Sequence, residues 1–75
     1  MNESDQFKVG SAVGWQEGDN RMFGTVAEIY TEPISEEIAG VVVTSDASPD
    51  NPAYLLSMSG NQRTLKRRSE LRAAD

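Results

Sequence analysis

Apolar and small or polar residues alternate in the first part of the chain. Between residues 7 and 15 the large apolar side chains all fall on odd positions: Phe7, Val9, Val13 and Trp15. This alternation is typical of a strand with one buried face, and it predicts a first strand over residues 12–16. The next four residues, 17–20, read Glu-Gly-Asp-Asn. They predict a chain reversal, since Gly18 tolerates positive φ and Asp and Asn side chains bond to nearby backbone.

The second predicted strand, residues 22–31, carries an irregularity. Val26 and Ile29 are three positions apart, which breaks the period of two. A bulge or a strong bend would let both side chains point inward, and bent strands close small barrels. Gly24 suits a close approach of another backbone near the bend.

Residues 31–40 interrupt the strand pattern and predict a loop or a short helix. Pro33 limits ladder pairing, Glu36 and Glu37 are expected at the surface, and Gly40 suits the end of a helical turn. The β-branched run that follows predicts a third strand over residues 41–44. The next segment, residues 47–52, contains two prolines and predicts a loop.

A hairpin is predicted near the C-terminus, where residues 53–59 and 62–67 flank Gly60-Asn61, a favourable two-residue turn. In that register Ser59 faces Gln62, and Leu56 meets Leu65 in the core. The other face of the hairpin would carry a mostly polar set suited to solvent or a ligand: Leu55, Ser57, Thr64 and Lys66.

The two ends of the chain differ in their predicted structure. Residues 1–6 offer nothing apolar to bury and are predicted to be a disordered tail, with a single domain over residues 7–75. The last eight residues predict a short helical turn with Ser69 as its cap and Leu71 as its anchor. Five short strands in 75 residues predict an all-β fold, a small five-stranded antiparallel SH3-like or Tudor-like barrel, because closure hides strand edges.

The composition of the chain indicates where in the cell the protein is expected. The chain has no cysteine, so nothing indicates an oxidising compartment, and a cytoplasmic location is expected. The start of the chain is polar and does not resemble a secretion signal. The longest apolar run, residues 38–43, is far shorter than the roughly 20 residues that span a bilayer. A soluble protein is therefore predicted.

Charge is unevenly distributed along the chain. The net charge is −5, with ten acidic residues against Lys8 and Arg21 in residues 1–60, but five basic residues against two acidic ones in residues 61–75. The simplest interpretation is that the basic end neutralises acids elsewhere on the fold. The alternative is a contact surface for phosphates or an acidic partner, made by Lys66, Arg67, Arg68 and Arg72. A protein or peptide partner is at least as well supported as nucleic acid, which would also need exposed stacking rings.

The residue types argue against catalysis and metal binding. Histidine and cysteine are both missing, which removes the usual neutral-pH base and the thiol nucleophile. Glu36, Glu37, Asp46 and Asp50 are interpreted as solvated loop acids. Residues 46–51 lack the alternating carboxylates, the central glycine and the closing glutamate of a calcium loop. We therefore expect no enzyme activity, no metal and no cofactor.

The aromatic residues raise the question of a cation-binding cage, in which ring faces attract a methylated cation. Phe7, Trp15 and Tyr54 are expected to be needed as core in so small a domain. Phe23 and Tyr30 are the better candidates for exposure and for partner contact. Two rings seldom complete a cage.

The order of these features resembles the hypervirulence-associated protein TUDOR-domain family. The resemblance covers about residues 7–71 and rests on a series of short elements: Gly10, Val13 with Trp15, Gly24 with Val26 and Ile29, Thr31, Gly40, Ala47-Ser48, Pro52 with Tyr54, and Gly60. It implies a compact SH3-like barrel in a largely bacterial group of short proteins or domains. It implies no particular activity.

The chain departs from the family pattern at two places. Ser11 stands where the family usually has an acidic residue, and Lys66-Arg67 stand where it has a His-Lys pair. We therefore do not expect this chain to have a family activity that depends on that histidine. Taken together, the sequence predicts a non-catalytic Tudor-like interaction module for a protein or peptide, with nucleic acid binding through the basic C-terminal segment as the alternative.

Overall fold

The computed structural model describes residues 7–74 and is entirely β in its regular structure apart from two short 3-10 turns. A five-stranded antiparallel sheet has the order β6-β5-β2-β1-β7, and β3 and β4 form a separate two-stranded hairpin, which we call the arm. The elements are β1 (Ala12–Glu17), β2 (Asn20–Tyr30), β3 (Ile34–Ile38), β4 (Val41–Ser45), β5 (Ala53–Met58), η2 (Ser59–Asn61), β6 (Gln62–Arg67), η3 (Arg68–Glu70) and β7 (Arg72–Ala73). This is a small Tudor/SH3-like fold, so the predicted fold class is confirmed.

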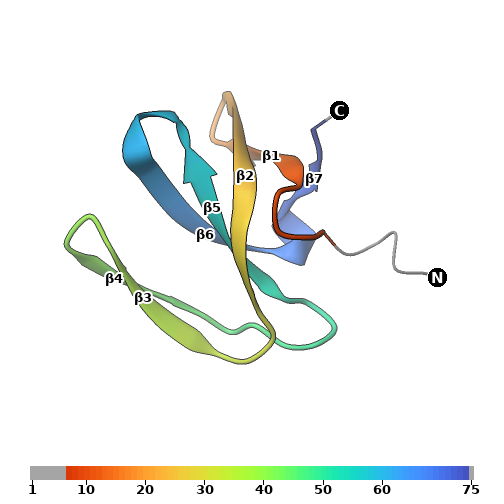
Figure 1. Ribbon diagram of the computed structural model, residues 1–75, viewed down its shortest axis with the longest axis vertical. Coiled ribbons are helices and arrows are strands. Elements are labelled where there is room, and N and C mark those ends of the chain that lie inside the picture. The colour runs from red at the N-terminus through yellow and green to blue at the C-terminus, as the bar shows by residue number, and fades with distance from the viewer. Residues whose placement is uncertain (1–6, 75) are drawn as a thin grey trace.

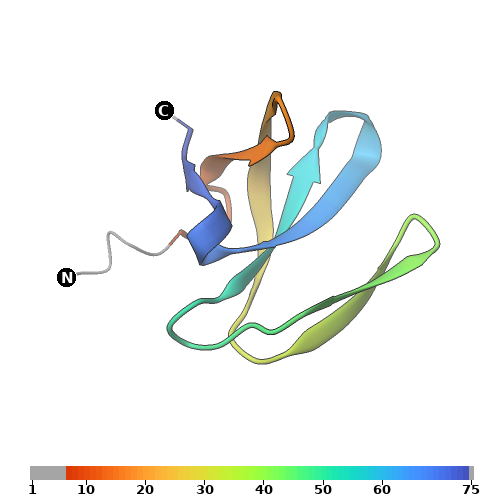
Figure 2. The same ribbon diagram turned by 180° about the vertical axis from the view of Figure 1, so that it is seen from behind.

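The arm forms a second layer beside the sheet. Figures 1 and 2 show it extending below β5 and β6, while β2 runs the length of the molecule. Neither of the short turns in the part of the chain described is a helix long and apolar enough to cross a membrane. The predicted tail at residues 1–6 lies outside the described residues.

The first hairpin agrees with its prediction. Glu17 pairs with Asn20 around a turn in which Gly18 has φ 61°. The expected bulge in β2 is also present, as a register shift between Val26 and Glu28. Its effect is to place Ile29 on the same face as Val26, because their partners on β5 are two residues apart. Ile29 nevertheless stays 38% exposed at the margin of the sheet.

The prediction of a loop or short helix over residues 31–40 was wrong. Residues 34–38 form β3, and Ile34 and Ile38 pack against the core. Glu36 lies between them on the inner face, with a carboxylate oxygen 3.1 Å from the Tyr30 hydroxyl. The Glu36-Glu37 pair suggested a loop, but Glu36 has a polar neighbour in the Tyr30 hydroxyl. An acidic residue on the inner face is therefore compatible with a strand here.

The C-terminal hairpin forms, but its predicted register was off by one residue. The loop takes three residues, with Gly60 and Asn61 both at positive φ, so Met58 pairs with Gln62. Leu65 is therefore opposite Leu55, not Leu56. A shift of one residue moves side chains to the other face. The mostly polar face expected from Leu55, Ser57, Thr64 and Lys66 does not exist.

Strand β5 is buried on both faces and divides the core in two. One cluster contains Val13, Trp15, Val26, Tyr54, Leu56 and Leu71. The other contains Ala47, Ala53, Leu55 and Leu65 and is covered by apolar residues of the arm. Alternate residues of β5 supply the two clusters, as the period of a strand requires. Both leucines predicted as core, Leu56 and Leu65, are buried.

The chain returns to the first hairpin at its C-terminus. Leu71 is buried, as predicted, and β7 then pairs with Val13 and Gly14 of β1. Ser69 is not the cap of the short turn η3; its N–H donates to Asn51 Oδ1 at 2.9 Å. The side chain that closes the turn is that of Glu70, whose Oε1 accepts a hydrogen bond from the Arg67 N–H at 2.8 Å.

Candidate binding surface

The candidate surface lies on the side of β1, β2 and β7 that faces away from the first core cluster. Val13 and Trp15 point into that cluster. Successive residues of a strand face opposite sides, so Gly14 and Gln16 lie on the outer face. Gly14 is paired with both Phe23 and Arg72, and Gln16 is paired with Arg21. Directly opposed residues of antiparallel strands share a face. We call this set, Gly14, Gln16, Arg21, Phe23 and Arg72, the Phe23 surface.

Phe23 is a large apolar side chain that is 55% exposed and lies on a glycine. A Cβ atom built on Gly14 would lie 3.2 Å from Phe23 Cδ1 and 3.3 Å from Cε1. The ring therefore sits directly over the backbone of β1. Aromatic side chains left open to solvent in this way are common anchors of binding interfaces.

Two arginines stand beside this ring, one from each neighbouring strand of β1. Arg21 is exposed and is steered by Gln16, whose Oε1 accepts a long hydrogen bond from Arg21 Nε at 3.4 Å. Gln16 is in turn held by donating from Nε2 to the Gly18 carbonyl at 3.0 Å. The only ion pair within residues 7–74 joins Lys66 and Glu17. Neither arginine of the surface is thus neutralised by a described carboxylate.

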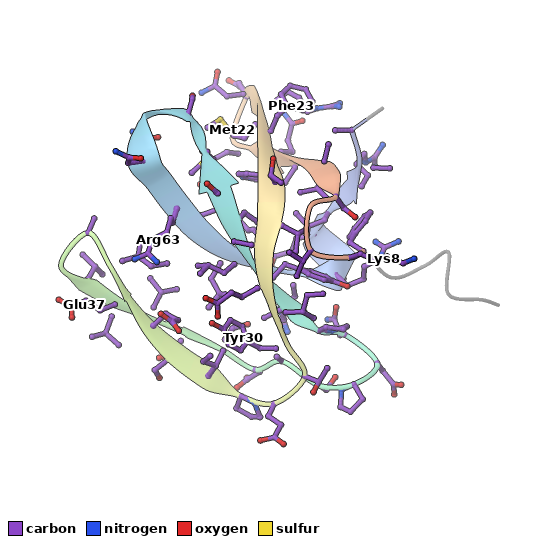
Figure 3. The ribbon with its side chains drawn as sticks, in the orientation of Figure 1. Lys8, Met22, Phe23, Tyr30, Glu37 and Arg63 are labelled. Atoms are coloured by element: carbon purple, nitrogen blue, oxygen red, sulfur yellow. The ribbon has the colours of Figure 1, made fainter. Side chains whose placement is uncertain are left out.

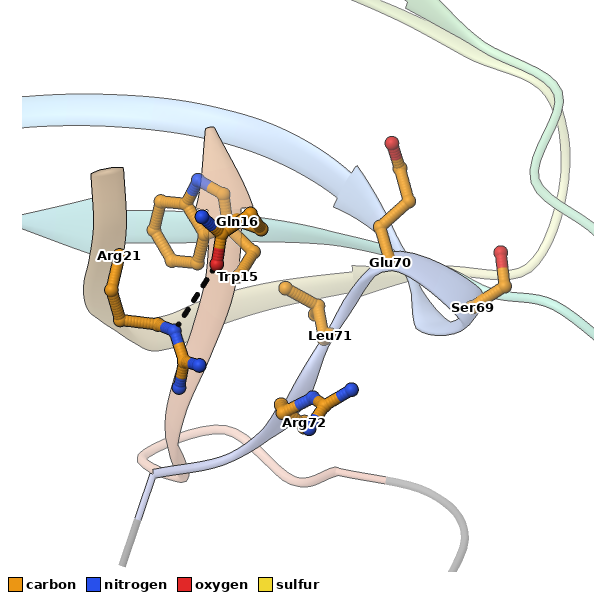
Figure 4. Close-up of a pocket in the computed structure, with 7 residues that line it drawn as sticks. All are labelled: Trp15, Gln16, Arg21, Ser69, Glu70, Leu71 and Arg72. Atoms are coloured by element: carbon orange, nitrogen blue, oxygen red, sulfur yellow. Dashed lines mark hydrogen bonds between the residues drawn. The ribbon is translucent and has the colours of Figure 1, made fainter. Parts of the chain in front are cut away.

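A hollow of about 190 Å³ opens between β1 and the segment that leads into β7. Figure 4 shows Arg21 and Arg72 on the two sides of β1, both away from the end of the Glu70 side chain. The hollow is lined by Trp15, Gln16, Arg21, Ser69, Glu70, Leu71 and Arg72. Glu70 is engaged with the Arg67 N–H, and the Ser69 hydroxyl accepts from Asn51 Nδ2 at 3.2 Å. The hollow therefore holds two guanidinium groups and one carboxylate, that of Glu70, which bonds to the backbone of Arg67.

Comparison with known proteins identifies the family. The family model described as Hypervirulence associated proteins TUDOR domain matches residues 10–71, which is most of the chain. The chain belongs to this family. No curated protein and no solved structure gives a significant match. The match to the TUDOR-domain model takes in the whole Phe23 surface except Arg72, which follows it directly.

The basic segment of this TUDOR domain does not form one patch. Lys66 Nζ lies 3.9 Å from Glu17 Oε1 on the opposite side of the sheet from Phe23. Arg68 stacks on the Phe7 ring, with its Cζ 4.4 Å from the ring centroid, and its Nη1 donates to the Leu71 carbonyl. Arg67 is half-buried and lines a different hollow, together with Asp46. Of the four predicted cations, only Arg72 is on the Phe23 surface.

The aromatic residues of the TUDOR domain divide between core and surface. Trp15 and Tyr54 are buried, and Phe7 packs edge-on against Tyr54 with ring centroids 5.7 Å apart. Phe23 is exposed, as expected. Tyr30 is half-buried at the other end of β2, beside the arm, so the two candidate rings do not meet (Figure 3).

Tyr30 is instead part of a polar clasp between β2 and the arm. Its hydroxyl donates to Glu28 and lies 3.1 Å from a Glu36 oxygen. The hydrogen bond to Glu28, followed by burial and the second carboxylate, raises the pKa of the Tyr30 hydroxyl far above its usual value. Among the described residues no three metal-ligating side chains gather here or elsewhere. The clasp joins the arm to the sheet.

Glu28→Gln should lower the pKa of Tyr30, because it removes the main stabiliser of the protonated phenol. The unfolded chain ionises a tyrosine near pH ~10, whereas the folded chain keeps this proton. Stability is therefore expected to fall as the pH rises above about 10. Ultraviolet titration of phenolate absorbance should show one tyrosine ionising earlier in the variant than in the wild type. Superimposable titration curves would contradict the clasp.

Arg21, Gln16 and Gly14 were missed by sequence reasoning. The signal for them was present in the turn at residues 17–20, because closing that turn between Glu17 and Asn20 fixes Gln16 opposite Arg21 and Gly14 opposite Phe23. Charge alone did not single out Arg21, since it is isolated in an acidic part of the chain. Glu36 and Glu37, expected on a loop, lie on β3.

Proposed function

We propose that this TUDOR domain is a non-catalytic interaction module that binds a protein or peptide through the Phe23 surface. The observation that carries the proposal is the exposed Phe23 ring on Gly14 between two arginines without described acidic partners. Aromatic and arginine side chains are the residues most often responsible for binding energy at protein interfaces. No directly opposed pair on this face of β1, β2 and β7 contains an acidic residue.

Two further features support binding rather than catalysis. The sequence lacks histidine and cysteine, so a base near neutral pH and a thiol nucleophile are both missing. Two polar side chains of the hollow are already engaged: Glu70 accepts from the Arg67 N–H, and the Ser69 hydroxyl accepts from Asn51 Nδ2. The remaining groups of the surface bind and orient; they do not transfer protons readily.

Replacing Phe23 with alanine is the direct test. A random peptide library panned on the full chain should enrich binders, and Phe23→Ala should raise the Kd of an enriched peptide at least about tenfold, a typical loss for an aromatic anchor. Val42→Ala is the matched control, because Val42 is an apolar residue 68% exposed on the arm. Panning that enriches nothing, or equal losses in the two variants, would refute the proposal.

Single-stranded nucleic acid is the second candidate partner. An aromatic ring flanked by cations on a sheet is also the arrangement on which unpaired bases stack. Against it stands the net charge of −5, which repels a polyanion. Nucleic acid binding requires an affinity that falls steeply with salt. A titration of single-stranded DNA and RNA at low salt that shows no binding would eliminate this candidate.

A further inference from the structure

The hollow between β1 and the segment that leads into β7 has the size of a site for one small anionic group and is lined by two arginines of the Phe23 surface. Its volume of about 190 Å³ is below the ~300–1,000 Å³ of sites that enclose drug-sized ligands. Arg21 and Arg72 reach it from opposite sides of β1 (Figure 4). Both are exposed, and the acidic residue in the lining, Glu70, is turned toward the Arg67 N–H. An incoming anion would meet guanidinium groups that no described carboxylate neutralises, and the Arg21 group would have only the long hydrogen bond to Gln16 to exchange.

The overall charge of the domain limits what that anion can be. The chain carries 12 acidic residues against 7 basic ones, so a ligand with many charges is repelled at long range. Two arginines suffice for a group with one negative charge. The planar guanidinium fork matches a carboxylate in two parallel hydrogen bonds, which are stronger than neutral ones.

We infer that the Phe23 surface recognises a peptide carboxylate held by Arg21 and Arg72 next to an apolar side chain packed on Phe23. This inference rests on the proposed function and names the chemistry of its ligand. Phe23 and Arg72 are the two cross-strand partners of Gly14, and Arg72 also lines the hollow. The carboxylate and the apolar group therefore belong to the same residue of the peptide or to neighbouring residues.

The probes are two matched pairs of small compounds titrated into the full chain labelled with ¹⁵N. The first pair is a doubly capped phenylalanyl-aspartate dipeptide and its asparagine counterpart. The second is N-acetyl-phenylalanine and its amide, which places the carboxylate at a chain end. The acid of at least one pair should bind about tenfold more tightly than its neutral partner, as for a charge-assisted hydrogen bond. The amide signals of Gly14, Gln16 and Phe23 should shift.

The variants separate the two parts of the site. Arg21→Gln with Arg72→Gln should abolish the preference for the acids and leave weak binding of the neutral compounds. Arg63→Gln is the matched control, because Arg63 is an exposed arginine that projects from β6 toward the arm (Figure 3). The control should keep the full preference. Phe23→Ala should weaken the acids and their neutral partners alike.

Several results would overturn the inference. One is equal affinity for the acid and its neutral partner in both pairs, and another is a preference for the acid that survives loss of both arginines. The others are no shift of the amide signals with any of the four compounds, and tighter binding of a phosphoserine dipeptide than of the aspartate dipeptide. The proposed function fails separately, when library panning yields no peptide that depends on Phe23. Enriched peptides that depend on Phe23 but lack both acidic residues and a free C-terminal carboxylate would support the proposed function and contradict the carboxylate inference.

Discussion

Replacing Leu56 with alanine is expected to lower the free energy of unfolding by roughly 2–5 kcal/mol. The side chain is fully buried in the first core cluster, on the strand that both clusters share. Its removal costs the transfer free energy of the lost groups and leaves a cavity that β5, held on two faces, cannot close. The total free energy of unfolding of a native protein is only about 5–15 kcal/mol. Denaturant unfolding followed by Trp15 fluorescence measures the loss.

The control for this change is Ile29→Ala on β2. Ile29 is on the same face as the first cluster but is 38% exposed. Its truncation should cost well under half as much as that of Leu56, because part of the side chain already contacts water. Similar losses at the two positions would show that β5 is not the strand on which the core depends.

Adding a single methyl group at Gly24 is expected to cost roughly 1–3 kcal/mol, the usual range for overpacking. A Cβ atom there would lie 3.0 Å from the Ser57 carbonyl oxygen and 3.2 Å from Trp15 Cη2. Neither neighbour yields easily, since one is backbone of β5 and the other is a buried ring. The variant Gly24→Ala should therefore lower the denaturation midpoint, measured as for Leu56→Ala.

Gly14→Ala provides a comparison on the neighbouring strand. The closest atom to its added Cβ belongs to the Phe23 ring, at 3.2 Å. That ring is exposed and can move outward, and the backbone contact, with the Met22 carbonyl oxygen at 3.3 Å, is longer than the one at Gly24; a smaller loss of stability is therefore expected than for Gly24→Ala. The affinity for a ligand should fall more than the free energy of unfolding, because the added methyl group displaces the Phe23 ring from the backbone of β1. The reverse order of stabilities would mean that Phe23 is more firmly fixed than its exposure indicates.

Local signals predicted the parts of the fold that local geometry controls. The turn at Gly18, the bulge after Val26 and the loop before Ala53 each follow from residue types within a few positions. Strand β3 could not be recognised in this way, because Glu36 is accommodated by Tyr30, a residue on another strand. The hairpin register depended on a single residue: including Ser59 in the loop moved Leu55 from the expected polar face into the second cluster.

The candidate surface was partly visible in the sequence. Exposure of Phe23 could be expected, and Arg72 stood out in the basic segment. What could not be predicted was the dispersal of Lys66, Arg67 and Arg68, which results from alternation along β6 and from the turn that begins at Arg68. Arg21 joined the surface only through cross-strand pairing. Basic residues that are close together in the sequence are therefore not necessarily close together on the folded sheet.

The burial of β5 on both faces has a consequence for how this domain can change over generations. The arm covers only the second cluster, and its tip, Ala39-Gly40, is an exposed turn between Ile38 and Val41. Residues inserted at that tip would leave the first cluster and the Phe23 surface untouched, since loop tips absorb added length at little cost. Selection can therefore lengthen the arm at its tip, while Ile34, Ile38 and Val43 at its base stay constrained because they cover the second cluster.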